Sequence, residues 1–233
     1  MKEVIVALSF SLLFLMVSNA VPVNGVNSIN IITPENKPYG LSYQEHVINF
    51  WKHILAIPAD GNPWNDRTGE SCAVGQLQTN SSVFYLSGNG GGKSDLICKM
   101  PAGKGLFIPV SPMEISDKEA PNKSIEELHT IAREDQDSVN SLYLKIGDTE
   151  YMFPDLKKYR ISTPDFNVVY PQSAIFGADE GNAKAVADGF YVITTPLPTG
   201  NYSITYRSSL GCLGPDCVEP AFAQDVNYKL TVK

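Results

Sequence analysis

The sequence is poor in charge and in basic clusters. Charged residues make up 18% of its 233 residues, against roughly 25% in an average soluble domain. Lys and Arg number 18 against 25 Asp and Glu, so the net charge is −7. Proteins that bind a phosphate backbone need a basic surface. The composition therefore argues against nucleic acid as a partner.

Histidine is also scarce, with three residues in the chain. His46 and His53 are seven residues apart on an expected helix, about 10.5 Å along its axis. Histidines that share a metal on one helix normally lie four residues apart. His129 is alone on a second expected helix. We therefore predict no catalytic triad or metal site built on histidine, and interpret all three as surface or core-edge side chains.

A single long apolar run is present, at residues 4–16, and it is too short to span a bilayer, which takes about 20 residues. A short polar start precedes it, and Ser18-Asn19-Ala20 follows with small residues at the cleavage positions. This pattern predicts a secretory signal peptide over residues 1–20, with an uncleaved anchor as the alternative. We expect residues 21–233 to form one secreted domain without a membrane span.

Four cysteines are an even number, which in a secreted chain favours disulfides. Of the three pairings, we favour Cys72–Cys98 and Cys212–Cys217, because each pair is local and flanked by turn residues. Zinc is the alternative, but it needs two close pairs, and only the second pair is close. Three Asn-x-Ser sequons in turn-like surroundings are candidate glycosylation sites: Asn80, Asn122 and Asn201.

Two amphipathic helices are predicted. Ser42 and Glu45 form a capping box before apolar residues at helical spacing, and Pro58 stops that helix. Ser124 and Glu127 form a second capping box. The apolar face that follows includes Ile125, Leu128, Ala132 and Val139.

The rest of the chain reads as an extended arm over 21–38 and many short strands with turn signals between them. They are expected at 83–86, 95–100, 106–110, 141–146, 150–153, 159–162, 167–170, 189–195, 201–208 and 226–232. This spacing predicts a mainly β fold, a β-sandwich or jelly roll with two peripheral α-helices.

A glycine-rich segment, residues 87–94, comes close to a phosphate-binding loop. Ser87 stands where the first glycine of that motif should be, and the following Asp95–Cys98 reads as a strand rather than a helix. We interpret the segment as a glycine hairpin.

The polar loop at residues 60–70 is the strongest candidate site in the sequence. Trp64 is a candidate for stacking on a sugar or another partner. The oxygen side chains suit calcium or, as carboxylates, a glycosidase acid/base pair, and turns favour the same residues for backbone reasons. They are Asp60, Asn62, Asn65, Asp66 and Glu70.

Several short segments of the sequence resemble those of a family of uncharacterised secreted proteins from bacteria and archaea. They include Trp51, the loop from Asn62 to Gly69 and the Cys72-Ala-Val-Gly-Gln76 segment, together with Pro101-Ala-Gly-Lys104 and the end of the chain. The resemblance implies export and the Cys72–Cys98 pairing. The family has no assigned activity, so it implies no functional residue.

These observations favour a secreted, non-catalytic binding or cell-surface protein, with a glycan or a cell-surface component as partner. No cofactor is predicted, apart from calcium as an alternative for the loop at 60–70. The second hypothesis is a secreted carbohydrate-active hydrolase that uses Asp60, Asp66 or Glu70. The third is a filament or envelope subunit, in which residues 21–32 add a strand to a neighbour's sheet.

Overall fold

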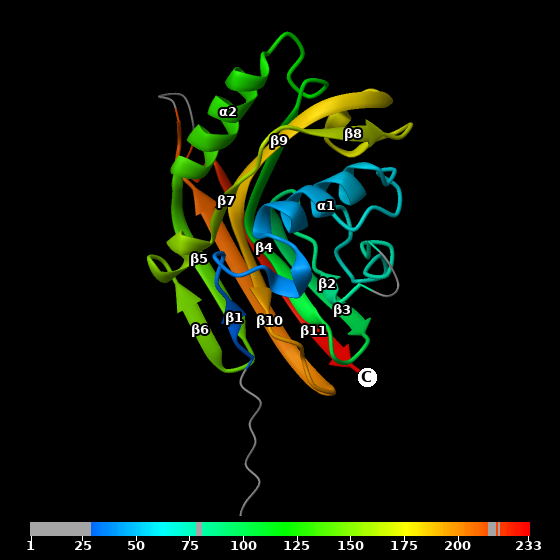
Figure 1. Ribbon diagram of the computed structural model, residues 1–233, viewed down its shortest axis with the longest axis vertical. Coiled ribbons are helices and arrows are strands. Elements are labelled where there is room, and N and C mark those ends of the chain that lie inside the picture. The colour runs from blue at the N-terminus through cyan, green and yellow to red at the C-terminus, as the bar shows by residue number, and fades with distance from the viewer. Residues whose placement is uncertain (1–28, 78–80, 214–217, 219) are drawn as a thin grey trace, which may run out of the picture.

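A computed structural model describes residues 29–77, 81–213, 218 and 220–233. The predicted signal peptide, the sequon Asn80 and Cys217 lie outside the described residues. Two sheets and two α-helices form the fold, as the sequence predicts (Figure 1). None of the described helices is long and apolar enough to cross a membrane.

The first sheet is built around one long central strand, β9. β9 pairs with β1, β4, β7 and β8, and β2 extends the sheet from β4 in parallel. Its strands are β1 (Ile31–Ile32), β2 (Val83–Tyr85), β4 (Gly105–Ser116), β7 (Arg160–Ser162), β8 (Phe166–Tyr170) and β9 (Gly181–Thr194). The described end of the predicted N-terminal arm thus pairs within its own chain, as β1.

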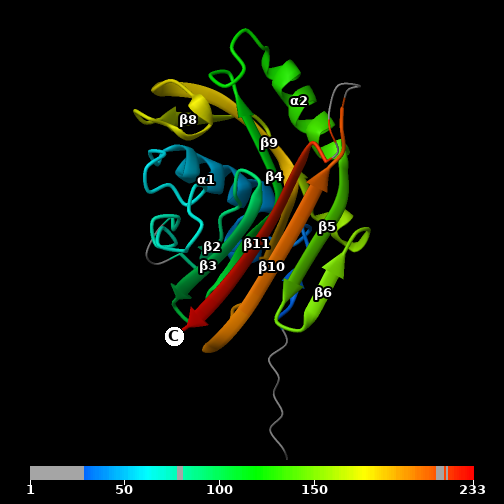
Figure 2. The same cartoon turned by 180° about the vertical axis from the view of Figure 1, so that it is seen from behind.

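The second sheet has the order β3-β11-β10-β5-β6, and Figure 2 shows it from its open side. β3 and β11 are parallel, and the other pairs are antiparallel. Its strands are β3 (Gly92–Met100), β5 (Val139–Ile146), β6 (Thr149–Met152), β10 (Gly200–Leu210) and β11 (Phe222–Val232).

Burial shows which sheet is central. β10 and β11 bury alternate residues, as strands with one solvent face do. β4 and the second half of β9 bury nearly every residue, so both faces of the first sheet are covered. α1 (Tyr43–Leu55) lies on the face away from the second sheet, where Phe50 packs against Phe107 of β4 (Figures 1 and 2).

Both helices begin where the sequence predicts. The hydroxyls of Ser42 and Ser124 accept from backbone N–H groups, and Glu45 and Glu127 complete the two capping boxes. α2 (Ile125–Asp137) packs on β4 and β9. The predicted apolar face extends too far, because Val139 belongs to β5 and the chain turns after α2.

Short one-turn helices occur at η1 (Pro38–Gly40), η2 (Asp155–Tyr159) and η3 (Ile175–Gly177). The Cys72–Cys98 disulfide is present and ties the loop after α1 to β3. The pairing Cys212–Cys217 involves a residue outside the described chain. Asn122 and Asn201 are both exposed, as glycosylation sites must be.

Candidate binding cavity

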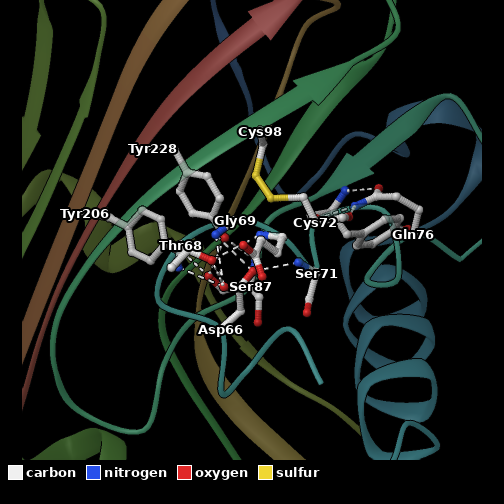
Figure 3. The surroundings of a disulfide bond; sticks show 12 residues. Asp66, Thr68, Gly69, Ser71, Cys72, Gln76, Ser87, Cys98, Tyr206 and Tyr228 are labelled. Atoms are coloured by element: carbon white, nitrogen blue, oxygen red, sulfur yellow. Dashed lines mark hydrogen bonds between the residues drawn. A yellow bond between two sulfur atoms is a disulfide. The ribbon is translucent and has the colours of Figure 1, made fainter. Parts of the chain in front are cut away.

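The predicted loop carboxylates do not gather around one site. Asp60 and Glu70 are exposed. Asp66 faces its own loop, where its carboxylate accepts from the backbone N–H groups of Thr68 at 2.8 Å, Gly69 at 3.0 Å and Ser71 at 2.8 Å (Figure 3). Burial alone would raise the pKa of Asp66, but these donors outweigh it and lower the pKa.

The amide of Asn62 is used in the same way. It donates to the carbonyls of Ile54 and Ile57 and accepts from the N–H of Trp64, which holds the loop to the end of α1. Within the described chain, no group of three or more His, Cys, Asp and Glu side chains is placed to hold a metal ion. The side chains of Asp66 and Asn62 are therefore used to hydrogen-bond the backbone and hold the loop in place.

Trp64 is buried but borders a large cavity. Its side chain is 6% exposed, and its ring lies 5.2 Å from that of Trp51 and 5.6 Å, edge-on, from that of Phe176. The glycine-rich segment lets the ring approach the backbone, because a Cβ on Gly88 would lie 3.2 Å from Trp64. Trp64 is thus part of a cavity wall rather than an exposed stacking platform.

We call this space the Glu114 cavity; it has a volume of about 420 Å³. α1, α2, β4, η3, the loop at 60–70 and the ends of β10 and β11 contribute to its wall. Aromatic rings line one part: Trp51, Trp64, Phe176 and Phe222. Polar side chains line another: Ser111, Glu114, Glu119, Asp135 and Gln136.

Buried polar atoms without a hydrogen-bond partner concentrate in this wall. Five such side-chain atoms occur among the described residues. Four of them belong to cavity-lining residues: Nε1 of Trp64, both carboxyl oxygens of Glu114 and Oε1 of Gln136. A buried polar group without a partner costs about 1–3 kcal/mol, so these atoms are available to hydrogen-bond to a molecule in the cavity.

Two neighbouring carboxyls of the wall are in different surroundings. Glu119 Oε2 accepts from the hydroxyls of Ser116 at 2.6 Å and Tyr170 at 2.8 Å. Burial raises the pKa of Glu119 in spite of these donors. Glu114 is 6% exposed, and its pKa is raised much further, first by burial and then by the negative charge of Glu119. Glu114 is therefore the weaker acid of this pair.

Phe176 lies at the exposed side of the cavity under backbone strain. It is 43% exposed and has a φ of 63°, a left-handed conformation that is unusual for a bulky residue. Such strain persists only where the surroundings impose it, and it concentrates at functional sites. Here it places an aromatic ring against Trp64 and Trp51.

The prediction from the sequence included Trp64 but not the carboxyls of the cavity wall. The strand predicted at 106–110 ends before Glu114, whereas β4 continues to Ser116. The available signal was a charged residue between Met113 and Ile115, which is unusual inside an apolar strand. Asp135 and Gln136 carried no signal, because polar residues at a helix end are ordinary.

The histidines lie away from this cavity. His46 is buried, between the carbonyl oxygen of Pro38, 2.9 Å from Nε2, and the hydroxyl of Tyr85, 2.8 Å from Nδ1. His53 and His129 are half-buried.

Comparisons with known proteins add little. No protein-family model and no curated protein matches the chain. A solved chain described as "Structure of PbICP-C in complex with falcipain-2" aligns over 65% of this chain and 98% of its own length, with 13% identity and a TM-score of 0.25. At that TM-score the likeness carries no argument about fold or function.

Proposed function

We propose that this is an extracellular binding protein that holds a small molecule in the Glu114 cavity. The observation that supports this most is that, among the described residues, four of the five buried polar side-chain atoms without a hydrogen-bond partner belong to residues that line this one cavity. Each hydrogen bond that such an atom lacks costs about 1–3 kcal/mol. Unpartnered atoms scattered through the core would indicate imperfect packing. Concentration in one wall supports a binding site there.

The lining defines what such a ligand must offer. The rings of Trp64, Phe176 and Phe222 suit an apolar or planar face, and Glu114 and Gln136 suit hydrogen-bonding groups. A volume of about 420 Å³ lies within the range of small-molecule sites. A sugar residue has both features, which keeps a glycan, the partner predicted from the sequence, among the ligand classes to test.

The extracellular setting rests on the predicted signal peptide and is consistent with the Cys72–Cys98 disulfide. The hydrolase hypothesis based on Asp60, Asp66 and Glu70 gains no support. None of the three lines the Glu114 cavity, and Asp66 is occupied by backbone donors. A binding role remains the function that the geometry favours.

Intrinsic fluorescence tests this proposal directly, because the chain has two tryptophans and both line the cavity. A library of mono- and disaccharides and small polar compounds is titrated into the purified protein. We expect at least one compound to shift the emission saturably and Phe222→Ala to weaken its binding about tenfold. Val169→Ala is the control, since Val169 is exposed on β8 and lies outside the cavity wall. Saturable ligands that bind both variants equally would contradict the proposal.

A further inference from the structure

We infer that the ligand of the Glu114 cavity carries an organic ammonium group, seated between the aromatic rings and the carboxyl of Glu114. This inference rests on the proposed function and narrows it from small molecules in general to one chemical class. Three features of the wall carry it: its charged groups, the state of Glu114 and its rings.

The charged groups of the wall are all acidic. Glu114, Glu119 and Asp135 line the cavity, and no Lys, Arg or His does so among the described residues. Arg160 lies against the last turn of α2, but its guanidinium is bound by Asp188 and Asp137 and stays outside the wall. An anionic ligand would meet three carboxyls and no counter-charge, which disfavours it.

Glu114 is the one of these three carboxyls that accepts no well-formed hydrogen bond. Glu119 is held by Ser116 and Tyr170, and Asp135 accepts from the amide of Gln136 at 2.9 Å. Glu114 is 6% exposed and lines the cavity. Neither of its oxygens accepts from a donor in good geometry, and its polar neighbours are the carboxyl of Glu119 and the hydroxyl of Tyr170. Its pKa is raised by burial and then by the negative charge of Glu119, and a cation beside the two carboxyls would offset both effects.

The rings favour an organic cation over a metal ion. Ammonium groups are attracted to aromatic faces, and the attraction grows as water is excluded. Four rings line this cavity. Glu114 and Glu119 are neighbours, but no group of three or more His, Cys, Asp and Glu side chains in the described chain is placed to hold a metal ion. A diffuse organic charge fits this arrangement better than a metal that needs several oxygens at one point.

The test uses two pairs of probes that differ only in the charged group. Choline is compared with its uncharged isostere 3,3-dimethyl-1-butanol, and D-glucosamine with D-glucose, by calorimetry and tryptophan fluorescence. We expect the charged member of at least one pair to bind about tenfold more tightly than the neutral member. We expect Glu114→Gln, which keeps the shape of the side chain, to abolish that preference, and Glu70→Gln, at an exposed position, to preserve it.

The outcomes separate the two proposals. Neutral probes that bind as tightly as the charged ones, or a charge preference that survives in Glu114→Gln, overturn the ammonium inference and leave the binding function intact. Binding of calcium chloride in preference to choline also overturns it. If no probe and no library compound binds, both proposals fail. Should Glu114→Gln fold poorly by its melting curve, Asp135→Asn takes its place, with a smaller loss of preference expected.

Discussion

Two carboxyls of this protein show opposite responses to removal from water. The carboxylate of Asp66 accepts from the N–H groups of three residues of its own loop, and its pKa is lowered. Glu114 is more deeply buried and accepts no well-formed hydrogen bond, and its pKa is raised by burial and by the negative charge of Glu119. The same functional group therefore stabilises one region and leaves the other incomplete.

The backbone around each residue explains the difference. In the loop at 66–71 the N–H groups of Thr68, Gly69 and Ser71 have no strand partner, so they are free to donate to Asp66. β4 pairs with β9 along most of its length, including Glu114 opposite Ala187, so its N–H groups are committed to the sheet. A carboxyl on a paired strand must therefore rely on side chains, and the neighbours of Glu114 are a second carboxyl, Glu119, and the hydroxyl of Tyr170.

The largest effect should come from removing the satisfied carboxyl. Asp66→Ala leaves several backbone donors without an acceptor, and we expect a loss of about 3 kcal/mol in the free energy of unfolding. Because the folded pKa of Asp66 is lowered, its contribution is present above pH 3.8 and is lost as pH falls through the folded pKa. Urea denaturation at pH 7 and pH 3 measures both.

Asp60→Ala is the matched control for this change, since Asp60 is exposed in the same loop. We expect it to alter stability by less than about 0.5 kcal/mol. Equal losses for the two variants would show that the donors around Asp66 do not set its role, and the contrast with Glu114 would then fail.

The opposite pH dependence of stability is expected for Glu114. Its folded pKa lies above the unfolded value of 4.5, so its stabilising contribution is present below pH 4.5 and is lost as pH rises through the folded pKa. Glu114→Gln cannot ionise. We expect its stability relative to the native protein to improve by on the order of 1 to 2 kcal/mol between pH 4.5 and pH 8.

Urea denaturation at several pH values measures this difference, and Glu126→Gln on the exposed side of α2 serves as its control. A constant difference between Glu114→Gln and the native protein across this range would mean that Glu114 is ionised when buried. The cavity would then need an internal counter-charge rather than a ligand.

A third effect concerns the strained ring beside the cavity. Phe176→Gly and Phe176→Ala both remove the ring, but only glycine adopts a φ of 63° without cost. We expect the glycine variant to be more stable than the alanine variant by about 1 kcal/mol, with both losing ligand affinity. Thermal unfolding and fluorescence titration report the two properties. Equal stability of the glycine and alanine variants would show that the backbone at Phe176 is not strained.

Local features were predictable from the sequence and the cavity was not. The capping boxes at Ser42 and Ser124 and the Cys72–Cys98 pairing depend on residues close in the chain, and all three are confirmed. The Glu114 cavity combines the middle of the chain with strand ends near Leu210 and Phe222. The residues that line it come together only after the sheets have formed, so no spacing in the sequence predicts the cavity.

The smallest effect is expected for substitutions beside Trp64, the residue that connects the loop at 60–70 to the Glu114 cavity. A Cβ on Gly88 would lie 3.2 Å from the Trp64 ring, a tight contact, whereas a Cβ on Gly90 would lie 3.7 Å away, an ordinary one. We expect Gly88→Ala to cost up to about 1 kcal/mol and to shift tryptophan emission.

Gly90→Ala is the comparison variant: Gly90 also lines the cavity, but its Cβ would meet Trp64 only at ordinary contact distance. Neither glycine has a positive φ that would add strain. We expect Gly90→Ala to leave both stability and emission close to native. If Gly88→Ala changes emission and ligand affinity together while Gly90→Ala leaves emission unchanged, the position of Trp64 sets the shape of the Glu114 cavity. If the two variants behave alike, the ring tolerates displacement, and the loop stabilises the fold without shaping the cavity.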